Sequence, residues 1–176
     1  MKIAYTFIAI LLISISSLQA QTKTWNSLLQ KHVDNKGWVN YDGFKKEQTQ
    51  LDTYLAYLQK TNPNTLKSDN AKKAFWINAY NAYTIKLILN HYPLKSILDI
   101  KVDGKNAWET PFAKVGGKTY TLNHIEHEIL RKQYSNPNIH VGVNCASVSC
   151  PALPNTAFTE KNIDALLTKN MKSFVN

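Results

Sequence analysis

Two cysteines and a histidine near the C-terminal end are the residues whose types and spacing best suit chemistry. Cys145 and Cys150 are the only cysteines in the 176-residue sequence, and His140 precedes Cys145 by five positions. In an exported protein a close cysteine pair predicts a disulfide. The alternative is that Cys145 is a thiolate nucleophile with His140 as its base, as in thiol hydrolases and acyl transferases.

The relative orientation of the His140 and Cys145 side chains depends on the backbone conformation of segment 139–143. It is short and rich in β-branched residues, which predicts a buried strand. In a regular strand His140 and Cys145 point to opposite faces of the sheet. The thiol hypothesis therefore requires the strand to end before Cys145.

A second group of titratable residues lies in the sequence TLNHIEHEILRKQY, which is patterned as a helix. We expect Asn123 to cap it and Glu126 to complete a capping box. Glu126 is also a candidate to orient a catalytic histidine, and His127 is a candidate to contact a substrate. The alternative for this group is a solvated helix face.

A metal site is a third interpretation of the same residues. His124 and His127 are three residues apart and share a helix face, where zinc is commonly bound. However, His124 to His127 is one residue shorter than the H-x-x-E-H pattern, and C-x4-C is not the usual spacing of a zinc knuckle. We therefore predict no metal and no cofactor.

The central element that must position these groups is the segment 74–89. Its apolar residues fall on every side of a helical wheel, which predicts a helix buried inside a globular domain. Asn78 and Asn81 lie on the same side of that helix, and a buried amide requires hydrogen-bond partners. The two amides either bond loop backbone and fix the packing, or they line a site.

The remaining pattern predicts helices over 24–34, 41–61 and 160–174, and a hairpin with arms 108–115 and 118–120. The fold class is therefore α+β: a mostly helical single domain around the buried central helix, with a small β-sheet that contains the hairpin and residues 139–143. If the separate segments converge, they form one site. Its predicted catalytic residues are Cys145, His140 and Glu126, and its predicted substrate-binding residues are Asn78, Asn81 and His127.

Composition and the N-terminus indicate an exported protein. Residues 1–20 have a basic start, an apolar run and small residues before Ala20, which predicts a secretory signal cleaved after Ala20. Once the signal is removed we expect no membrane-spanning segment. The net charge is +9, but the lysines are scattered without a stripe of basic and aromatic residues, so nucleic acid is not an expected partner.

Three stretches carry a resemblance: AFWINAYNAYTIKLIL, LNHIEHEILR and IHVGVNCASVSCPAL, in this order. Together they resemble the DUF547 family of domains of unknown function, and the resemblance extends over residues 25–175. It implies a single domain over 21–176 and some similarity to papain-like and transglutaminase-like thiol folds. Members of the family usually continue beyond the last helix, so this sequence is either truncated at its C-terminus or a short member.

The resemblance does not supply an activity, and two classes of function remain open. The first is an exported hydrolase or acyl transferase of the thiol type. The second is a non-catalytic binding or structural domain of the cell envelope. The expected ligand in either class is a small molecule, a peptide or a glycan.

Overall fold

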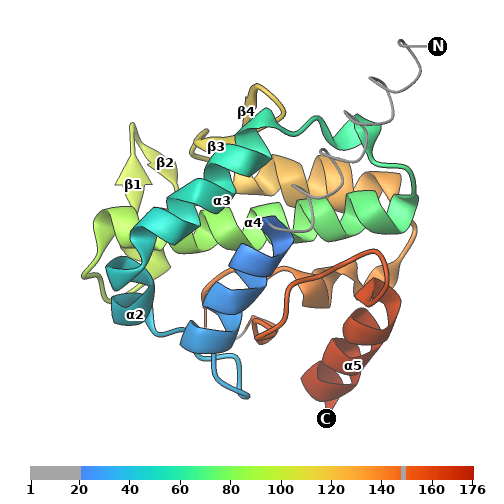
Figure 1. Ribbon diagram of the computed structural model, residues 1–176. Helices are drawn as coiled ribbons and strands as arrows, with labels where there is room; N and C mark the ends of the chain where they lie inside the picture. Colours follow the sequence, from blue (N-terminus) through green and yellow to red (C-terminus); the bar gives the residue numbers. More distant parts are fainter. Residues whose placement is uncertain (1–20, 148–149) are drawn as a thin grey trace, which may run out of the picture.

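Helix α4 (Asp69–His91) is the centre of the computed structural model (Figure 1). The structure describes residues 21–147 and 150–176; the expected signal segment lies outside them. Sixteen of the 23 residues of α4 are buried, and they leave no polar face. The predicted buried central helix is confirmed.

Both ends of α4 follow from local sequence. The side chain of Ser68 accepts a hydrogen bond from the backbone N–H of Ala71, which satisfies one of the free donors of the first turn. At the other end Pro93 has no N–H and cannot continue the helix. The remaining elements, after an N-terminal helix over 21–32, are α2 (Tyr41–Lys46), α3 (Gln48–Lys60), η1 (Pro63–Thr65), η2 (Ile97–Asp99), β1 (Lys101–Val102), β2 (Lys105–Asn106), β3 (Ala113–Val115), β4 (Lys118–Tyr120), η3 (His124–Arg131), η4 (Pro137–Gly142) and α5 (Ile163–Val175).

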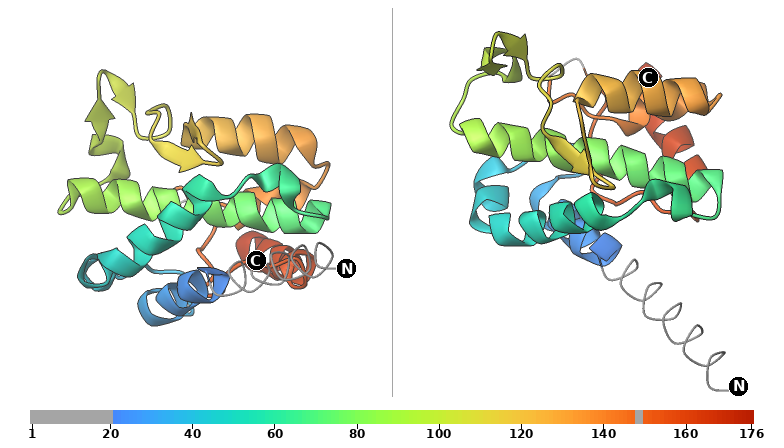
Figure 2. Two further views of the ribbon diagram at one scale, coloured as in Figure 1. Left: turned by 45° about the horizontal axis from the view of Figure 1, so that its top comes forward. Right: turned by 90° about the horizontal axis from the view of Figure 1, so that it is seen from above.

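These elements cover α4 from two sides. Figure 2 shows η3 and the hairpins on one side of α4, and the N-terminal helix with α3 on the other. Helix α5 packs against η4 and also contacts α4. The arrangement brings η3 and η4 next to each other, with η3 packed on α4.

The sheet consists of two separate antiparallel hairpins, β1 with β2 and β3 with β4. In the second hairpin Ala113 pairs with Tyr120 and Val115 with Lys118. The predicted hairpin is therefore present, but its first arm begins at Ala113 and not at Trp108. The fold is a mostly helical α+β domain, as expected.

The predicted helix over 41–61 is two helices, because the chain turns at Glu47. The Glu47 carboxylate is 2.7 Å from Lys31 Nζ and 2.6 Å from His32 Nε2 on the N-terminal helix. The hydrogen bond from Lys31 lowers the pKa of the Glu47 carboxyl most, and the one from His32 lowers it further. A contact with a distant helix is not visible in helical periodicity, so the sequence did not indicate the break.

The strand predicted over 139–143 is wrong. Residues Pro137–Gly142 form a 3-10 helix that begins at Asn136, whose side chain accepts a hydrogen bond from Asn138 N–H. A Cβ at Gly142 would lie 2.9 Å from Leu167 and 3.0 Å from Ile77, so α5 and α4 bury this segment. A short apolar run between two helices carries the same sequence pattern as a strand inside a sheet.

Candidate functional site

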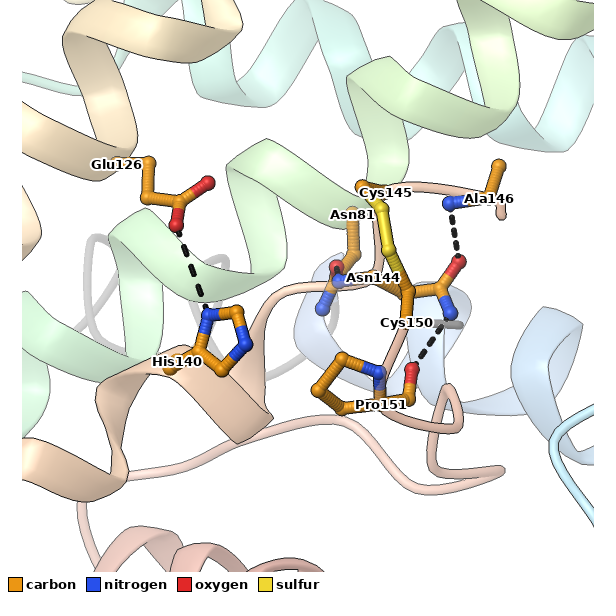
Figure 3. Close-up of a disulfide and its surroundings, with 8 residues drawn as sticks. All are labelled: Asn81, Glu126, His140, Asn144, Cys145, Ala146, Cys150 and Pro151. Atoms are coloured by element: carbon orange, nitrogen blue, oxygen red, sulfur yellow. Dashed lines mark hydrogen bonds and ion pairs between the residues drawn. A yellow bond between two sulfur atoms is a disulfide. The ribbon is translucent and has the colours of Figure 1, made fainter. Parts of the chain in front are cut away.

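The pair formed by Glu126 and His140 is the clearest chemical feature near the C-terminal half of α4. Glu126 lies on η3 and His140 on η4, and Glu126 Oε1 is 3.8 Å from His140 Nδ1 (Figure 3). The Glu126 side chain is 14 % exposed and the His140 side chain 44 %. Nδ1 of His140 is buried and has no hydrogen-bond partner in the described part of the chain, so the accessible part of the ring is the part away from Glu126.

Two further groups lie close to the Glu126 carboxylate. Arg131 Nε lies 3.7 Å from the same carboxylate oxygen. The buried hydroxyl of Tyr80, on α4, lies close enough to Glu126 for the carboxylate to affect it, although it makes no hydrogen bond of normal geometry. Burial, and then the charge of Glu126, raise the pKa of Tyr80 far above its usual value. A carboxylate in this setting is suited to orient an imidazole.

Asn81 fixes the chain between His140 and the cysteines. Its Nδ2 donates to the carbonyl of Gly142 at 2.9 Å, and its Oδ1 accepts from the N–H of Asn144 at 2.9 Å. The amide side chain thus holds both sides of Val143 in a single orientation. In Figure 3 the Asn81 side chain is drawn between the Glu126–His140 pair and the disulfide.

Cys145 and Cys150 form a disulfide, with their Cα atoms 6.0 Å apart. Asn144 supports the loop from the inside: its Nδ2 donates to Pro151 O at 2.7 Å, and its Oδ1 accepts from Ala146 N–H at 3.0 Å. In this state neither sulfur is a thiolate. The cysteine pair therefore forms the disulfide that the sequence predicts as one of its two alternatives.

The change from strand to 3-10 helix alters the relation of His140 to Cys145. Strand alternation does not apply to η4, so nothing in the local backbone places the two side chains on opposite faces. The His140 ring is also covered at one edge by Phe174 of α5, with ring centroids 6.0 Å apart.

Asn78 and His127 lie outside this group. The side chain of Asn78 makes its hydrogen bonds within the core. Its Oδ1 accepts from Trp25 Nε1 at 3.3 Å and from Phe158 N–H at 3.0 Å, and its Nδ2 donates to Phe158 O at 2.7 Å. Asn78 therefore fixes the packing by bonding backbone, which is the first of the two roles considered for the amides of the buried helix, and it does not line a site. His127 is exposed on η3. The structure thus brings Glu126 and His140 together, attaches Asn81 to the segment that links His140 to Cys145, and leaves Asn78 and His127 apart.

Three residues near the site were not identified from the sequence. The helical periodicity does not distinguish Tyr80 from its apolar neighbours, although its buried hydroxyl has no hydrogen-bond partner among the described residues. The sequence pattern likewise gives Asn144 and Phe174 no role in a site. The signal for Asn144 is its position directly before Cys145, where Asn side chains commonly stabilise turns.

The expected capping box at the start of η3 is not formed. Asn123 is itself helical and its side chain makes no cap hydrogen bond. The first turn instead uses Thr121, whose hydroxyl accepts from His124 N–H at 2.9 Å. Glu126 is therefore free of the capping role and turns toward His140 and Arg131.

Within residues 21–147 and 150–176 no group of three or more His, Cys, Asp or Glu side chains is arranged to hold a metal ion. In the same part of the chain, none of the helices has the length and apolar character needed to cross a bilayer.

Comparison with known proteins gives a family and no activity. No curated protein and no solved structure matches the chain. The model of the family described as "Protein of unknown function, DUF547" matches residues 63–175, which include α4, η3, η4, the disulfide and α5. With the match extending over more than half of its length, the chain belongs to the DUF547 family.

Proposed function

We propose that this protein is an exported hydrolase or acyl transferase in which His140 is the general base, Glu126 orients it and Cys145 is the nucleophile. The observation that carries the proposal is the Glu126–His140 pair, in which a largely buried carboxylate faces the buried ring nitrogen. The distance of 3.8 Å is longer than a hydrogen bond, and such contacts in unliganded enzymes commonly shorten when substrate binds.

The disulfide is, in this proposal, the oxidised resting state. A dithiol reductant supplies two electrons and two protons, which converts the bond between Cys145 and Cys150 into two thiols and leaves the reductant as a disulfide. Only residues 141–144 separate Cys145 from His140, and Asn81 holds that segment on the helix that also carries Tyr80. In this proposal reduction releases a thiol at Cys145, five residues after His140.

The reaction then follows the chemistry of acyl transfer. His140 takes the proton of the Cys145 thiol, the sulfur attacks the acyl carbonyl, and the proton passes to the leaving group as a thioester forms. Water, or another acceptor with a hydroxyl or amine, next attacks the thioester with His140 again as base. The acyl group leaves on the acceptor and the proton returns to the thiol.

The proposal is tested without knowledge of the substrate. In Cys150→Ser, Cys145 has no disulfide partner, and we expect iodoacetamide to alkylate it with a pH midpoint clearly below the value of about 8.5 for an ordinary thiol. Adding His140→Gln to this variant should return the midpoint to the ordinary value. Mass spectrometry of the modified peptide measures both.

Cys145→Ser is the matched control, because it leaves Cys150 as the free thiol at the other end of the same loop. Its alkylation should have the ordinary pH dependence. A panel of small esters then tests turnover: Cys150→Ser should hydrolyse them without reductant, and the native protein only after treatment with dithiothreitol. Ordinary reactivity of Cys145, unaffected by His140→Gln, would refute the catalytic proposal.

A non-catalytic binding or structural domain of the envelope is the second candidate. It is favoured by the disulfide, which occupies both sulfurs, and by Asn78 and Asn81, whose hydrogen bonds go to the protein's own backbone. In this case Cys150→Ser should lower stability and produce no esterase activity.

Export is part of the proposal in both cases. The disulfide supports it, because such bonds persist mainly in oxidising compartments. Expression of the full sequence in a bacterial host, followed by fractionation and mass measurement, should find a periplasmic or secreted protein that begins at Gln21. An intact chain retained in the cytoplasm would contradict it.

A further inference from the structure

A groove with a volume of about 600 Å³ lies next to the disulfide and is lined in part by the turn 34–38 and by α5. Small-molecule sites commonly have volumes of this size. Asn144, Cys150 and Phe174 are among the residues that line the groove. Phe174 also contacts His140. The groove therefore shares a wall with the Glu126–His140 site.

The turn 34–38 holds an aromatic side chain at the rim. Trp38 is 63 % exposed, which is unusual for so large an apolar group. Its backbone is fixed, because Asp34 Oδ1 accepts from Trp38 N–H at 2.9 Å and Trp38 O accepts from Asp34 N–H at 3.1 Å. Gly37 has a φ of +83°, and a Cβ there would lie 2.6 Å from the Ala152 side chain. The turn is thus seated against the groove wall, and the indole is presented by a rigid backbone.

Asparagine side chains form part of the lining of the groove. Asn155 Nδ2 donates to Asn35 Oδ1 at 3.1 Å, and Asn170 Nδ2 donates to Val141 O at 3.1 Å. These bonds use one end of Asn35 and Asn170 and leave Asn35 Nδ2 and Asn170 Oδ1 without a partner among the described residues. Fixed amides with a spare donor or acceptor are suited to bind hydroxyl groups.

The lining of the groove carries two lysines and one carboxylate among the described residues, so its net charge is positive. Lys36 and Lys169 line it, and neither forms an ion pair within the described part of the chain. The one carboxylate of the lining, Asp34, accepts hydrogen bonds from the N–H groups of Lys36 and Trp38. A ligand with negative charge is therefore favoured.

From this lining we infer that the groove binds an acidic oligosaccharide. The exposed indole of Trp38 and the ring of Phe174 offer flat apolar surfaces for sugar rings, the amides match hydroxyl groups, and Lys36 with Lys169 matches carboxylates. An extended peptide is disfavoured, because no strand borders the groove to provide the main-chain pairing typical of peptide recognition. Binding here does not require the reaction proposed above.

Intrinsic fluorescence tests the inference directly. Of the four tryptophans, Trp25 and Trp76 are buried and Trp108 is partly buried, so Trp38 is the one that a ligand in solvent can cover. Titration of the oxidised protein with tetragalacturonate should change the emission in a saturable way, with maltotetraose as the neutral control and tetraglutamate as the acidic peptide control. No reductant is present, so failure of binding and failure of thiol catalysis are separate results.

The variants locate the binding. We expect Trp38→Ala, followed by calorimetry, to weaken tetragalacturonate binding about tenfold, as aromatic anchors do. Lys36→Ala and Lys169→Ala should each weaken it about two- to fivefold, the range of an exposed charge pair. Lys105→Ala on β2 and Leu98→Ala, which removes an equally exposed apolar group away from the groove, should leave the affinity unchanged.

Three results would overturn the assignment. Equal binding of maltotetraose would remove the role of charge, and equal binding of tetraglutamate would reduce the groove to a general polyanion surface. Absence of saturable binding by tetragalacturonate, with the circular dichroism of a folded helical protein, would show that the groove does not take this class of ligand.

Discussion

The polar residues buried around α4 fall into two regions that differ in how well they are satisfied. Asn78 and Asn81, which are 4 % and 3 % exposed, direct both ends of their amides to backbone or indole partners at 2.7–3.3 Å. In contrast, the Tyr80 hydroxyl and His140 Nδ1 are buried without a hydrogen bond to any described residue, and Glu126 Oε1 lies 3.8 Å from His140 Nδ1.

This difference separates structural from functional polar groups. A buried group that completes its hydrogen bonds stabilises a single packing arrangement, whereas a buried group left unsatisfied costs free energy and persists where it has another use. The substitutions below test this difference. Changes at Asn78 and Asn81 should mainly affect stability, and changes at Glu126 and His140 should mainly affect the reactivity of Cys145.

Asn78→Ala should have the largest effect on stability. It leaves Trp25 Nε1 and both backbone groups of Phe158 without partners in the core, which we expect to cost about 3–4 kcal/mol. The melting temperature should fall by roughly 10 °C, measured by calorimetry. Asn90→Ala on the exposed part of the same helix is the control and should change little. A small loss for Asn78→Ala would end the distinction between the two regions.

Asn81→Ala should cost about 2–3 kcal/mol, because it frees one carbonyl and one N–H at Gly142 and Asn144. It also releases the segment that positions Cys145. In the Cys150→Ser background we therefore expect Asn81→Ala to raise the pH midpoint of Cys145 alkylation, while Asn78→Ala leaves it unchanged at a temperature where both variants are folded. Equal effects of the two substitutions on alkylation would mean that Asn81 has no positioning role.

Glu126→Gln and His140→Gln should each change the free energy of unfolding by less than about 1 kcal/mol, because the pair is not a hydrogen bond in the resting state. The same substitutions in Cys150→Ser should slow alkylation about tenfold near pH 7, where an ordinary thiol is only slightly ionised. Denaturant unfolding and alkylation rates provide the two measurements. A large loss of stability with normal alkylation would assign the pair to structure.

Tyr80→Phe should have the smallest effect at neutral pH, because the hydroxyl it removes has no hydrogen bond. Burial and Glu126 raise the folded pKa of Tyr80 above its unfolded value near 10, so its contribution is complete below about pH 10 and is lost as the pH rises further. Tyr80→Phe should therefore lose stability less steeply above about pH 10, by up to 1.4 kcal/mol per pH unit. Thermal melts from neutral to alkaline pH measure the slope, and an unchanged slope would place the hydroxyl in water.

Local rules of the sequence were sufficient for the elements that depend on neighbours along the chain. The apolar wheel of 74–89, the Ser68 cap and the proline after Tyr92 specify α4, and the Gly116-Gly117 turn specifies the hairpin that follows Ala113. The same rules located Asn78 and Asn81 as amides in need of partners, though not which partners they have.

Features that depend on contacts between residues far apart in the sequence were decided only by the tertiary structure. The chain turns at Glu47, whose carboxylate contacts Lys31 and His32 on another helix. Residues 137–142 form a 3-10 helix that is packed against α4 and α5 and has no neighbouring strand among the described residues. The pairing of Glu126 with His140 likewise depends on how η3 and η4 pack on α4. Periodicity records which residues are buried, but only the fold determines what they are buried against.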